Sequence, residues 1–432
     1  MLNFEPITEK DLELLYSFYK DCDYGLCEYS ALGKIMCIFM SNACYTVYEN
    51  NLLVRNRYRN EYCFDYPVPK EGADTEKALK AIEDYCIANE IAPAFVEIPE
   101  DKAQYLLTRY PYFSLLQVKS WCDYVYEAEK FKTFAGRKYS TQRNHINNFH
   151  KLYPEAVYRV LTDSDERAIE EFFKDYGATF EKDDEEALQE LEASQKMLKI
   201  KDNSILKTAG MFLGDKLIGV SLGEICGDML IIHIEKALHS YEGIYPTILK
   251  EFVNMFATEN IKWINREDDA DDEGLRKSKL RYRPDFFARK YFFEIENELK
   301  YTPETEPIKT EALTLIPVTK EGMDEDFYSK YKAKKALYFT VKKEEKNIGE
   351  IYFTDFDYRG GAYIKYDIRE NICKDHIKKA LKKVANFGLY SLHLCVVYAS
   401  CNESDGETQE VFSSFMRVKE TEGENVIFEK EV

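Results

Sequence analysis

The sequence lacks several features by which classes of protein are recognised. The most apolar run near its N-terminus, 35–40, is far shorter than the roughly 20 residues of a membrane helix, and we predict no transmembrane segment or signal peptide. The 11 cysteines are odd in number and form no Cys-x-x-Cys pair, and no histidine has zinc-finger spacing. We therefore expect a cytoplasmic protein with reduced cysteines and no metal.

Positive charge is also scarce. The 59 lysines and arginines face 78 acids, for a formal net charge of −19. Such a charge excludes broad, non-specific binding to nucleic acid or to an anionic membrane, but it allows a local basic pocket. Hydrophobic residues make up 45% and aromatic residues 14% of the 432 positions, which is enough to bury large cores. At roughly 100–200 residues per domain, the length predicts about two to four domains.

Hydrophobic periodicity predicts that helices and strands alternate along the chain. The predicted helices are 5–20, 75–89, 100–108, 138–152, 163–176, 186–197, 246–258, 374–387 and 409–416. The predicted strands are several within 31–66, then 95–98, 121–126, 157–161, 207–213, 217–224, 229–235, 263–266, 336–342, 348–353, 362–368, 392–398 and 426–429. Gly214-Asp215 is expected to form the turn of a hairpin.

The same order of elements occurs at least twice, which predicts a mixed α+β architecture. It resembles the GNAT fold of acyl-CoA N-acyltransferases. We expect tandem GNAT-like domains at 1–145 and 146–300, a linker at 301–311, and an additional GNAT-like domain at 312–432 that is degenerate. This last domain is expected to bind a partner or to dimerise.

Polar residues concentrate between positions 233 and 290. The stretch 233–237 ends a predicted strand, Gly243 opens a predicted helix, and 265–268 ends the next strand. Six acids within 267–273 precede seven bases within 276–290. Polar side chains at strand ends beside a glycine turn favour a substrate cleft over a solvated face.

Alternation along a strand places His233 and Glu235 on one face and Lys236 on the other. A His/Glu pair can orient an acceptor amine or hydroxyl and take its proton. The alternative is a polar pair that is simply satisfied in a partly buried strand. Asp268 or Glu267 can receive a cationic group, and the alternative there is an acidic, solvated loop.

Arg276 and Lys279 are candidates to hold a phosphate, because guanidinium and ammonium groups match it. The alternative is that they neutralise the acids before them. Arg143, His145 and Asn147 lie on the helix that joins the first two predicted domains, where His145 either braces that contact or touches substrate. Five further residues complete the predicted substrate site: Lys236, Tyr245, Asn265, Arg266 and Tyr282.

Motifs in this order resemble the phosphatidylglycerol lysyltransferase C-terminal-domain family, over about residues 1–300. The matching segments are 143–147, 233–237, 243–245, 265–268, 274–279, 282–284 and 290–291. The family has tandem GNAT-like domains related to Fem-type aminoacyltransferases. The resemblance implies transfer of an aminoacyl group from aminoacyl-tRNA to an amine, hydroxyl or headgroup, with tRNA as a partner.

A GNAT domain that binds acetyl-CoA holds the pyrophosphate on a glycine-rich loop at a helix N-terminus. Here the loop is 240–245, and only Gly243 fits. Tyr245 would obstruct a pyrophosphate and Glu242 would repel it, whereas a tRNA-linked donor does not need this loop. Two alternatives stay open: an N-acetyltransferase that uses acetyl-CoA through a diverged loop, and a non-catalytic scaffold.

Overall fold

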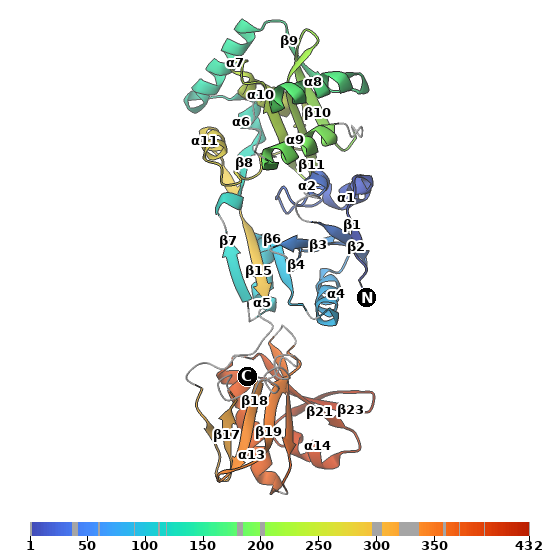
Figure 1. Ribbon diagram of the computed structural model, residues 1–432, viewed down its shortest axis with the longest axis vertical. Helices are drawn as coiled ribbons and strands as arrows, with labels where there is room; N and C mark the ends of the chain where they lie inside the picture. The colour runs from blue at the N-terminus through green and yellow to red at the C-terminus, as the bar shows by residue number, and fades with distance from the viewer. Residues whose placement is uncertain are drawn as a thin grey trace. The chain divides into compact units, whose positions relative to one another are not determined.

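The computed structural model describes residues 2–36, 42–58, 61–89, 91–110, 113–117, 119–178, 185–198, 204–295, 305–318, 337–356, 360–370, 372–392 and 394–431. One compact unit consists of Met1–Ala103 and Leu115–Phe293, and the other of Gln104–Ser114 and Glu294–Val432. The described residues form three mixed sheets with helices packed on them (Figure 1). The predicted mixed α+β class is therefore confirmed. No helix of these residues is long and apolar enough to cross a bilayer.

The first sheet has eight strands in the order β1-β2-β3-β4-β6-β15-β7, with β5 paired to β3. The strands are β1 (Glu5–Pro6), β2 (Cys44–Tyr48), β3 (Asn51–Tyr58), β4 (Glu61–Phe64), β5 (Val68–Pro69), β6 (Ala94–Pro99), β7 (Phe113–Gln117) and β15 (Lys290–Ile295). The helices in this part of the sequence are η1 (Glu9–Asp11), α1 (Leu12–Tyr19), α2 (Ala31–Met36), α4 (Thr75–Ala88) and α5 (Glu100–Arg109).

Two expectations for this part are wrong in detail. The stretch 5–20 is not one helix, because it begins with β1 and η1 before α1 starts. The stretch 31–66 begins with α2 rather than with a strand. Ala31, Leu32 and Ile35 are buried together, and their spacing suits one face of a helical turn better than the alternation of a strand.

The second sheet has seven strands in the order β14-β8-β13-β12-β11-β10-β9. They are β8 (Asp123–Glu127), β9 (Ala156–Val160), β10 (Lys207–Leu213), β11 (Lys216–Cys226), β12 (Met229–Ala237), β13 (Trp263–Asn265) and β14 (Phe286–Ala288). The helices are η2 (Lys119–Trp121), α6 (Ala128–Thr133), η3 (Arg137–Tyr139), α7 (Ser140–Leu152), η4 (Asp163–Asp165), α8 (Glu166–Gly177), α9 (Glu185–Leu198), α10 (Ile244–Phe256) and α11 (Glu273–Arg281).

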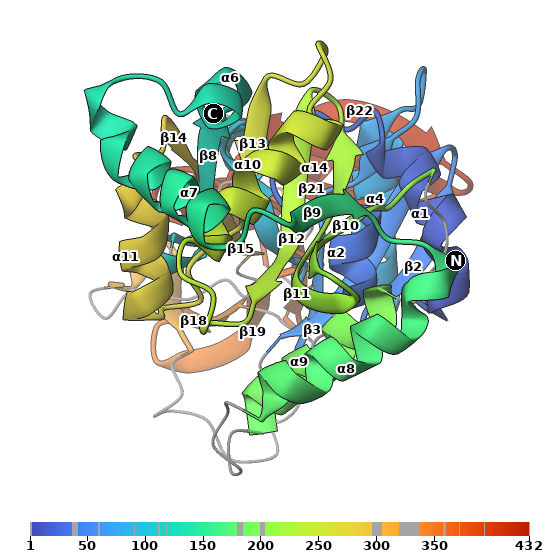
Figure 2. The same cartoon turned by 90° about the horizontal axis from the view of Figure 1, so that it is seen from above.

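Helix α10 covers one face of the second sheet. Its apolar residues Ile248, Leu249 and Phe252 are fully buried, and the helix packs against β10, β11 and β12. Helices α6 and α7 pack on α10, and α8 lies along β11 with α9 beside it (Figure 2). Strand β8 belongs to this sheet although it precedes residue 146. The domain boundary between 145 and 146 stays a prediction.

The second unit contains an eight-stranded sheet in the order β16-β17-β18-β19-β20-β21-β23-β22. The strands are β16 (Ile308–Lys309), β17 (Thr314–Pro317), β18 (Leu337–Lys343), β19 (Lys346–Thr354), β20 (Gly361–Ile368), β21 (Val396–Asn402), β22 (Arg417–Glu422) and β23 (Asn425–Glu431). Helices α13 (Lys374–Tyr390) and α14 (Gly406–Ser413) pack on it. Leu381 and Val384 of α13 join Phe339 and Ile351 in a core of its own. Strand β22, whose residues are all exposed, was not predicted.

Candidate functional site

A β-bulge in β12 decides where its polar side chains lie. The register with β11 shifts between Leu222 and Gly223, which makes His233 an extra residue in β12. An extra residue reverses the alternation of side chains beyond it. His233 therefore meets Glu224 on one face of the sheet, and Glu235 lies on the other face. The expectation that His233 and Glu235 share a face is wrong.

Glu235 forms a buried ion pair with Arg266. Arg266 donates from Nη2 and Nε to one carboxylate oxygen, Oε2, at 2.9 and 3.2 Å. Each side chain is only 11% exposed. Burial lowers the pKa of Arg266, but the Glu235 carboxylate outweighs that effect and raises it, so Arg266 carries its charge. The ring of Tyr282 lies beneath the guanidinium, with its centre 4.9 Å from the guanidinium carbon.

The pair leaves one acceptor and one donor without a partner. Glu235 Oε1 and Arg266 Nη1 are buried and form no hydrogen bond with any described residue. The buried hydroxyls of Ser221 and Tyr158 lie close to the same carboxylate. Buried polar atoms are normally hydrogen-bonded, so unpaired ones mark a place for a polar ligand. A free carboxylate oxygen can accept from an ammonium group of such a ligand, and the free guanidinium N–H can donate to a carbonyl of it.

His233 lies between two carboxylates on the opposite face. Its Nδ1 is 2.7 Å from Glu267 Oε1 and its Nε2 is 3.2 Å from Glu224 Oε1. The side chain has no exposed surface. Burial opposes protonation, but the hydrogen bonds to both carboxylates outweigh it and raise the pKa of His233 to about 10. With both ring nitrogens donating, His233 holds Glu267 in place; its role as a base stays a prediction.

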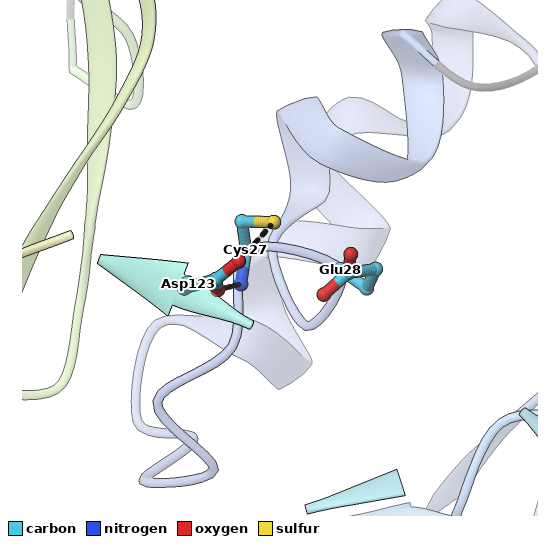
Figure 3. A group of neighbouring side chains, drawn as sticks. All are labelled: Cys27, Glu28 and Asp123. Carbon is cyan, nitrogen blue, oxygen red and sulfur yellow. Dashed lines mark hydrogen bonds between the residues drawn. The ribbon is translucent and has the colours of Figure 1, made fainter. Parts of the chain in front are cut away.

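Lys290 occupies a group of buried side chains next to this network. Figure 3 shows Cys27 and Glu28 on the segment before α2, and Asp123 at the start of β8. The Cys27 amide donates to Asp123 at 2.8 Å. The Lys290 ammonium lies 2.7 Å from Asp123 Oδ1, and it also contacts Glu28. The thiol and carboxylates are close enough together for a metal. Because Lys290 already supplies the positive charge, we assign no metal there.

The predicted acidic residues after β13 form the exposed edge of this network. The Asn265 amide donates to Asp123 at 2.8 Å and its oxygen accepts from the Glu267 amide at 2.7 Å. Asp268 lies 3.2 Å from Lys290. The side chains of Glu267 and Asp268 are 31% and 27% exposed, so a cation from solvent can reach them.

The predicted phosphate-binding residues are engaged inside the protein. Arg276 donates to Asp269 at 2.8 and 3.0 Å and to Asp271 at 2.6 Å. Lys279 donates to the backbone carbonyls of Arg266 and Asp268, and burial lowers its pKa. The contacts of Arg276 match the alternative interpretation, in which the bases neutralise the acids before them, whereas Lys279 bonds to backbone carbonyls and its binding of phosphate stays a prediction.

The remaining predicted residues lie around α7 and the end of β12. Arg143 donates to the backbone carbonyls of Phe134 and Gly136, whereas His145 and Asn147 are exposed. The Lys236 ammonium lies 5.5 Å from the centre of the Tyr176 ring. In the described part of the chain, no hydrogen bond or ion pair joins Arg143, His145 or Asn147 to the Glu235–Arg266 pair.

The N-terminus of α10 does not fit the pyrophosphate of CoA. The Tyr245 hydroxyl bonds to the backbone N and O of Ala237 at 3.3 and 3.2 Å, so its ring fills the space beside the first turn. Pro246, the third helical residue, has no N–H to donate. Gly243 faces the backbone carbonyl of His145 rather than an open cradle. An anion-binding helix needs free N–H groups, and this one offers few.

Sequence interpretation missed several residues of these networks. Glu224, Asp123 and Lys290 are almost completely buried. A charged residue inside an apolar strand, such as Glu224 in 217–224, is the signal that could have indicated them, because a buried charge needs a partner. Nothing in the sequence indicates Ser221 or Tyr158.

Comparisons with known proteins agree with the predicted family. The family described as "Phosphatidylglycerol lysyltransferase, C-terminal" matches residues 34–294. An uncharacterized protein of Mycoplasmoides gallisepticum is 28% identical over 180 residues, which are 41% of this chain and 57% of that protein. The chain thus spans little more than half the length of this curated relative.

Two solved structures are similar in fold. A conserved protein of unknown function from Bacteroides thetaiotaomicron is 23% identical, with a TM-score of 0.58 over 68% of this chain and 100% of that one. L-PGS from Bacillus licheniformis is 11% identical, with a TM-score of 0.51 over 69% of this chain and 95% of that one. The predicted family resemblance and GNAT-like fold are confirmed.

Proposed function

We propose an aminoacyl-transfer reaction for this chain, which belongs to the phosphatidylglycerol lysyltransferase C-terminal family because that family matches more than half of its residues. The donor is an aminoacyl-tRNA, and the acceptor is an amine or a hydroxyl. The reacting group binds at Glu235 and Arg266, on the face of the second sheet that α10 covers.

The observation that carries this proposal is the pair of unpartnered atoms in that ion pair. An aminoacyl ester has an α-ammonium group next to its ester carbonyl. The ammonium can donate to Glu235 Oε1, and the carbonyl can accept from Arg266 Nη1, both of which lack partners among the described residues. An acetyl thioester has the carbonyl but no ammonium, and would leave the carboxylate oxygen unpaired at a cost.

In the reaction, the acceptor nitrogen or oxygen attacks the carbonyl carbon of the ester. Its proton passes to the ribose oxygen of the tRNA, whose bond to that carbon breaks as the new bond forms. Negative charge develops on the carbonyl oxygen, and Arg266 is placed to stabilise it as a buried, fixed cation. Glu235 holds the aminoacyl group by its ammonium and keeps Arg266 oriented.

The N-terminus of α10 supports an RNA-linked donor over CoA. Tyr245 fills the space beside the first helical turn and Pro246 removes a donor, so the diphosphate of CoA has no site there. Acetyl-CoA should therefore leave the melting temperature unchanged, whereas a ligand that binds the native chain raises it. A rise with acetyl-CoA would favour an N-acetyltransferase instead.

A stable donor analogue tests the role of the ion pair. The probe is an aminoacyl-adenosine in which an amide replaces the ester, compared by calorimetry with the same compound N-acetylated. Because a hydrogen bond between charged groups is strong, we expect the free ammonium to improve affinity about tenfold or more. In Glu235→Gln this preference should disappear.

The matched control is Glu171→Gln, which changes a carboxylate that also pairs with an arginine but is 65% exposed. It should retain the preference for the free ammonium. Equal affinity of the two compounds for the unmodified protein would rule out an ammonium site at Glu235.

A further inference from the structure

Among the exposed basic side chains of the first unit that form no ion pair with any described residue, four lie on two neighbouring segments. They are Arg137, Lys138, Arg281 and Arg283. Neighbouring bases do form ion pairs, since Lys130 pairs with Asp285 and Lys277 pairs with Glu273. The chain has a net charge of −19, yet the acid that interacts electrostatically with Lys138, Asp285, is already paired with Lys130.

Two hydrogen bonds bring the four bases together. The Tyr139 hydroxyl donates to the carbonyl of Tyr282, and the Gln142 amide donates to the carbonyl of Arg281, each at 3.1 Å. Arg137 and Lys138 directly precede Tyr139, whereas Arg281 and Arg283 flank Tyr282. The segment of η3 and the start of α7 is therefore held against the end of α11, and the four bases on these segments are here called the basic ridge.

Helix electrostatics explains only half of this ridge. Arg281 and Arg283 lie at the C-terminus of α11, where the helix dipole favours cations. Arg137 and Lys138 lie in η3, just before the N-terminus of α7, where the dipole disfavours them. An anionic partner from outside the chain would stabilise all four.

The ridge begins next to the Glu235–Arg266 pair. Tyr282 lies between the two arginines of the ridge in sequence, and its buried ring contacts the Arg266 guanidinium. Arg281 and Arg283 thus adjoin in sequence the residue that contacts the pair. A ligand that reaches both places has a reactive end and a phosphate backbone close to it.

We propose that the basic ridge binds phosphates of the RNA that carries the aminoacyl group, close to its aminoacylated end. This inference rests on the proposed function and adds the surface that holds the donor. RNA suits the ridge better than a membrane does. A stem touches a local patch, whereas an extended anionic plane is repelled by a chain with a net charge of −19.

The number of phosphates that the ridge neutralises can be measured from the salt dependence of the binding affinity. Each neutralised phosphate contributes roughly 0.7 to 0.9 to the slope of log affinity against log salt concentration. Four contacts with phosphates should together contribute about −3 to that slope. Removing the four bases should lower the slope by about that amount and weaken binding at low salt at least tenfold.

The experiment measures binding of deacylated bulk tRNA by fluorescence anisotropy between about 50 and 200 mM salt. The test variant replaces Arg137, Lys138, Arg281 and Arg283 by alanine. The control variant replaces four lysines of the second unit, each of which pairs with an acid, and so removes equal charge: Lys365, Lys374, Lys378 and Lys379. Vesicles of anionic phospholipid are a parallel probe.

Loss of tRNA affinity and slope in the test variant, with the control variant unchanged, supports the ridge as the RNA surface. Equal tRNA binding by both variants overturns the ridge and leaves aminoacyl-tRNA as the donor. Vesicle binding that depends on the four bases, without tRNA binding, overturns it in favour of a membrane surface. If the unmodified chain binds no tRNA at all, both the ridge and the proposed donor are wrong.

Discussion

Burial gives charged side chains on the two faces of the second sheet different chemical roles. On one face, His233 has both ring nitrogens engaged and Lys290 is surrounded by carboxylates. On the other, Glu235 and Arg266 each keep one atom without a partner among the described residues. His233 and Lys290 thus position their neighbours. Glu235 and Arg266 have free atoms of opposite character in one ion pair, whereas Glu224 and Glu28 each keep only a free carboxylate oxygen.

His233 makes the stability of the first unit depend on pH. Its pKa is about 10 in the folded chain, above the ordinary value of 6.5, so the folded state holds a proton that the unfolded state has lost. Its contribution is complete below about pH 6.5 and is lost as the pH rises toward 10. Across this window the unfolding free energy should fall by up to about 1.4 kcal/mol per pH unit from this residue.

Urea unfolding at pH 7 and pH 9 tests whether the unfolding free energy falls as the pH rises. Tryptophan fluorescence is the probe, because both tryptophans of the chain, Trp121 and Trp263, lie in the first unit. The decrease should be smaller in His233→Gln than in the unmodified chain, and the exposed His145→Gln should behave like the unmodified chain. The same decrease in all three proteins would mean that His233 is not held as an imidazolium.

At the level of whole elements, local patterns predicted most of the second sheet. The helix predicted at 246–258 starts at Ile244, and the hairpin at 207–224 is present with its turn at Gly214-Asp215. The bulge at His233 could not be predicted, since it exists only relative to the pairing with β11. The alternation rule therefore assigned Glu235 to the wrong face.

Contacts between residues far apart in the sequence also determine what the predicted polar side chains do, which the sequence did not specify. The bases after position 275 read equally well as phosphate ligands or as counter-charges, and only the fold shows Arg276 against Asp269. Lys290 begins a strand of the first sheet, so its meeting with Asp123 depends on how two distant segments pack. The sequence indicated polar residues at the ends of β12 and β13, but not the partners that the fold gives them.

Gly243 was read as the remnant of a phosphate loop, and the structure gives a packing reason for it. Its φ is +83°, and a Cβ there would lie 2.3 Å from the backbone carbonyl oxygen of His145 in α7. Gly243→Ala must therefore move α7 away from α10. We expect it to destabilise the first unit by about 3 kcal/mol or more, measured by urea unfolding with tryptophan fluorescence.

Gly214→Ala is the matched control for this substitution. Gly214 also has a positive φ, +60°, but nothing lies within 4 Å of the position its Cβ would take. Only the backbone strain remains there, which costs about 1 kcal/mol. Equal effects of the two substitutions would mean that the contact between α7 and α10 is not what requires Gly243.

For the whole molecule, each compact unit has a core of its own. Leu249 of α10 is buried with Phe252 and Ile264 in the first unit, and Leu381 of α13 is buried with Val384 in the second. Hydrophobic stabilisation comes from local packing, so a cavity in one core should weaken that unit first. Both tryptophans lie in the first unit, whereas circular dichroism reports on both.

We therefore expect Leu381→Ala to destabilise the second unit by about 2–5 kcal/mol. Part of the circular dichroism transition should move to lower urea, while the transition followed by tryptophan fluorescence stays in place. Leu249→Ala, an equal change in the first core, should shift the fluorescence transition instead. If Leu381→Ala shifts the fluorescence transition as far as Leu249→Ala does, the two units unfold together, and ligand-induced melting shifts then report on the whole chain rather than on the unit that contains Glu235.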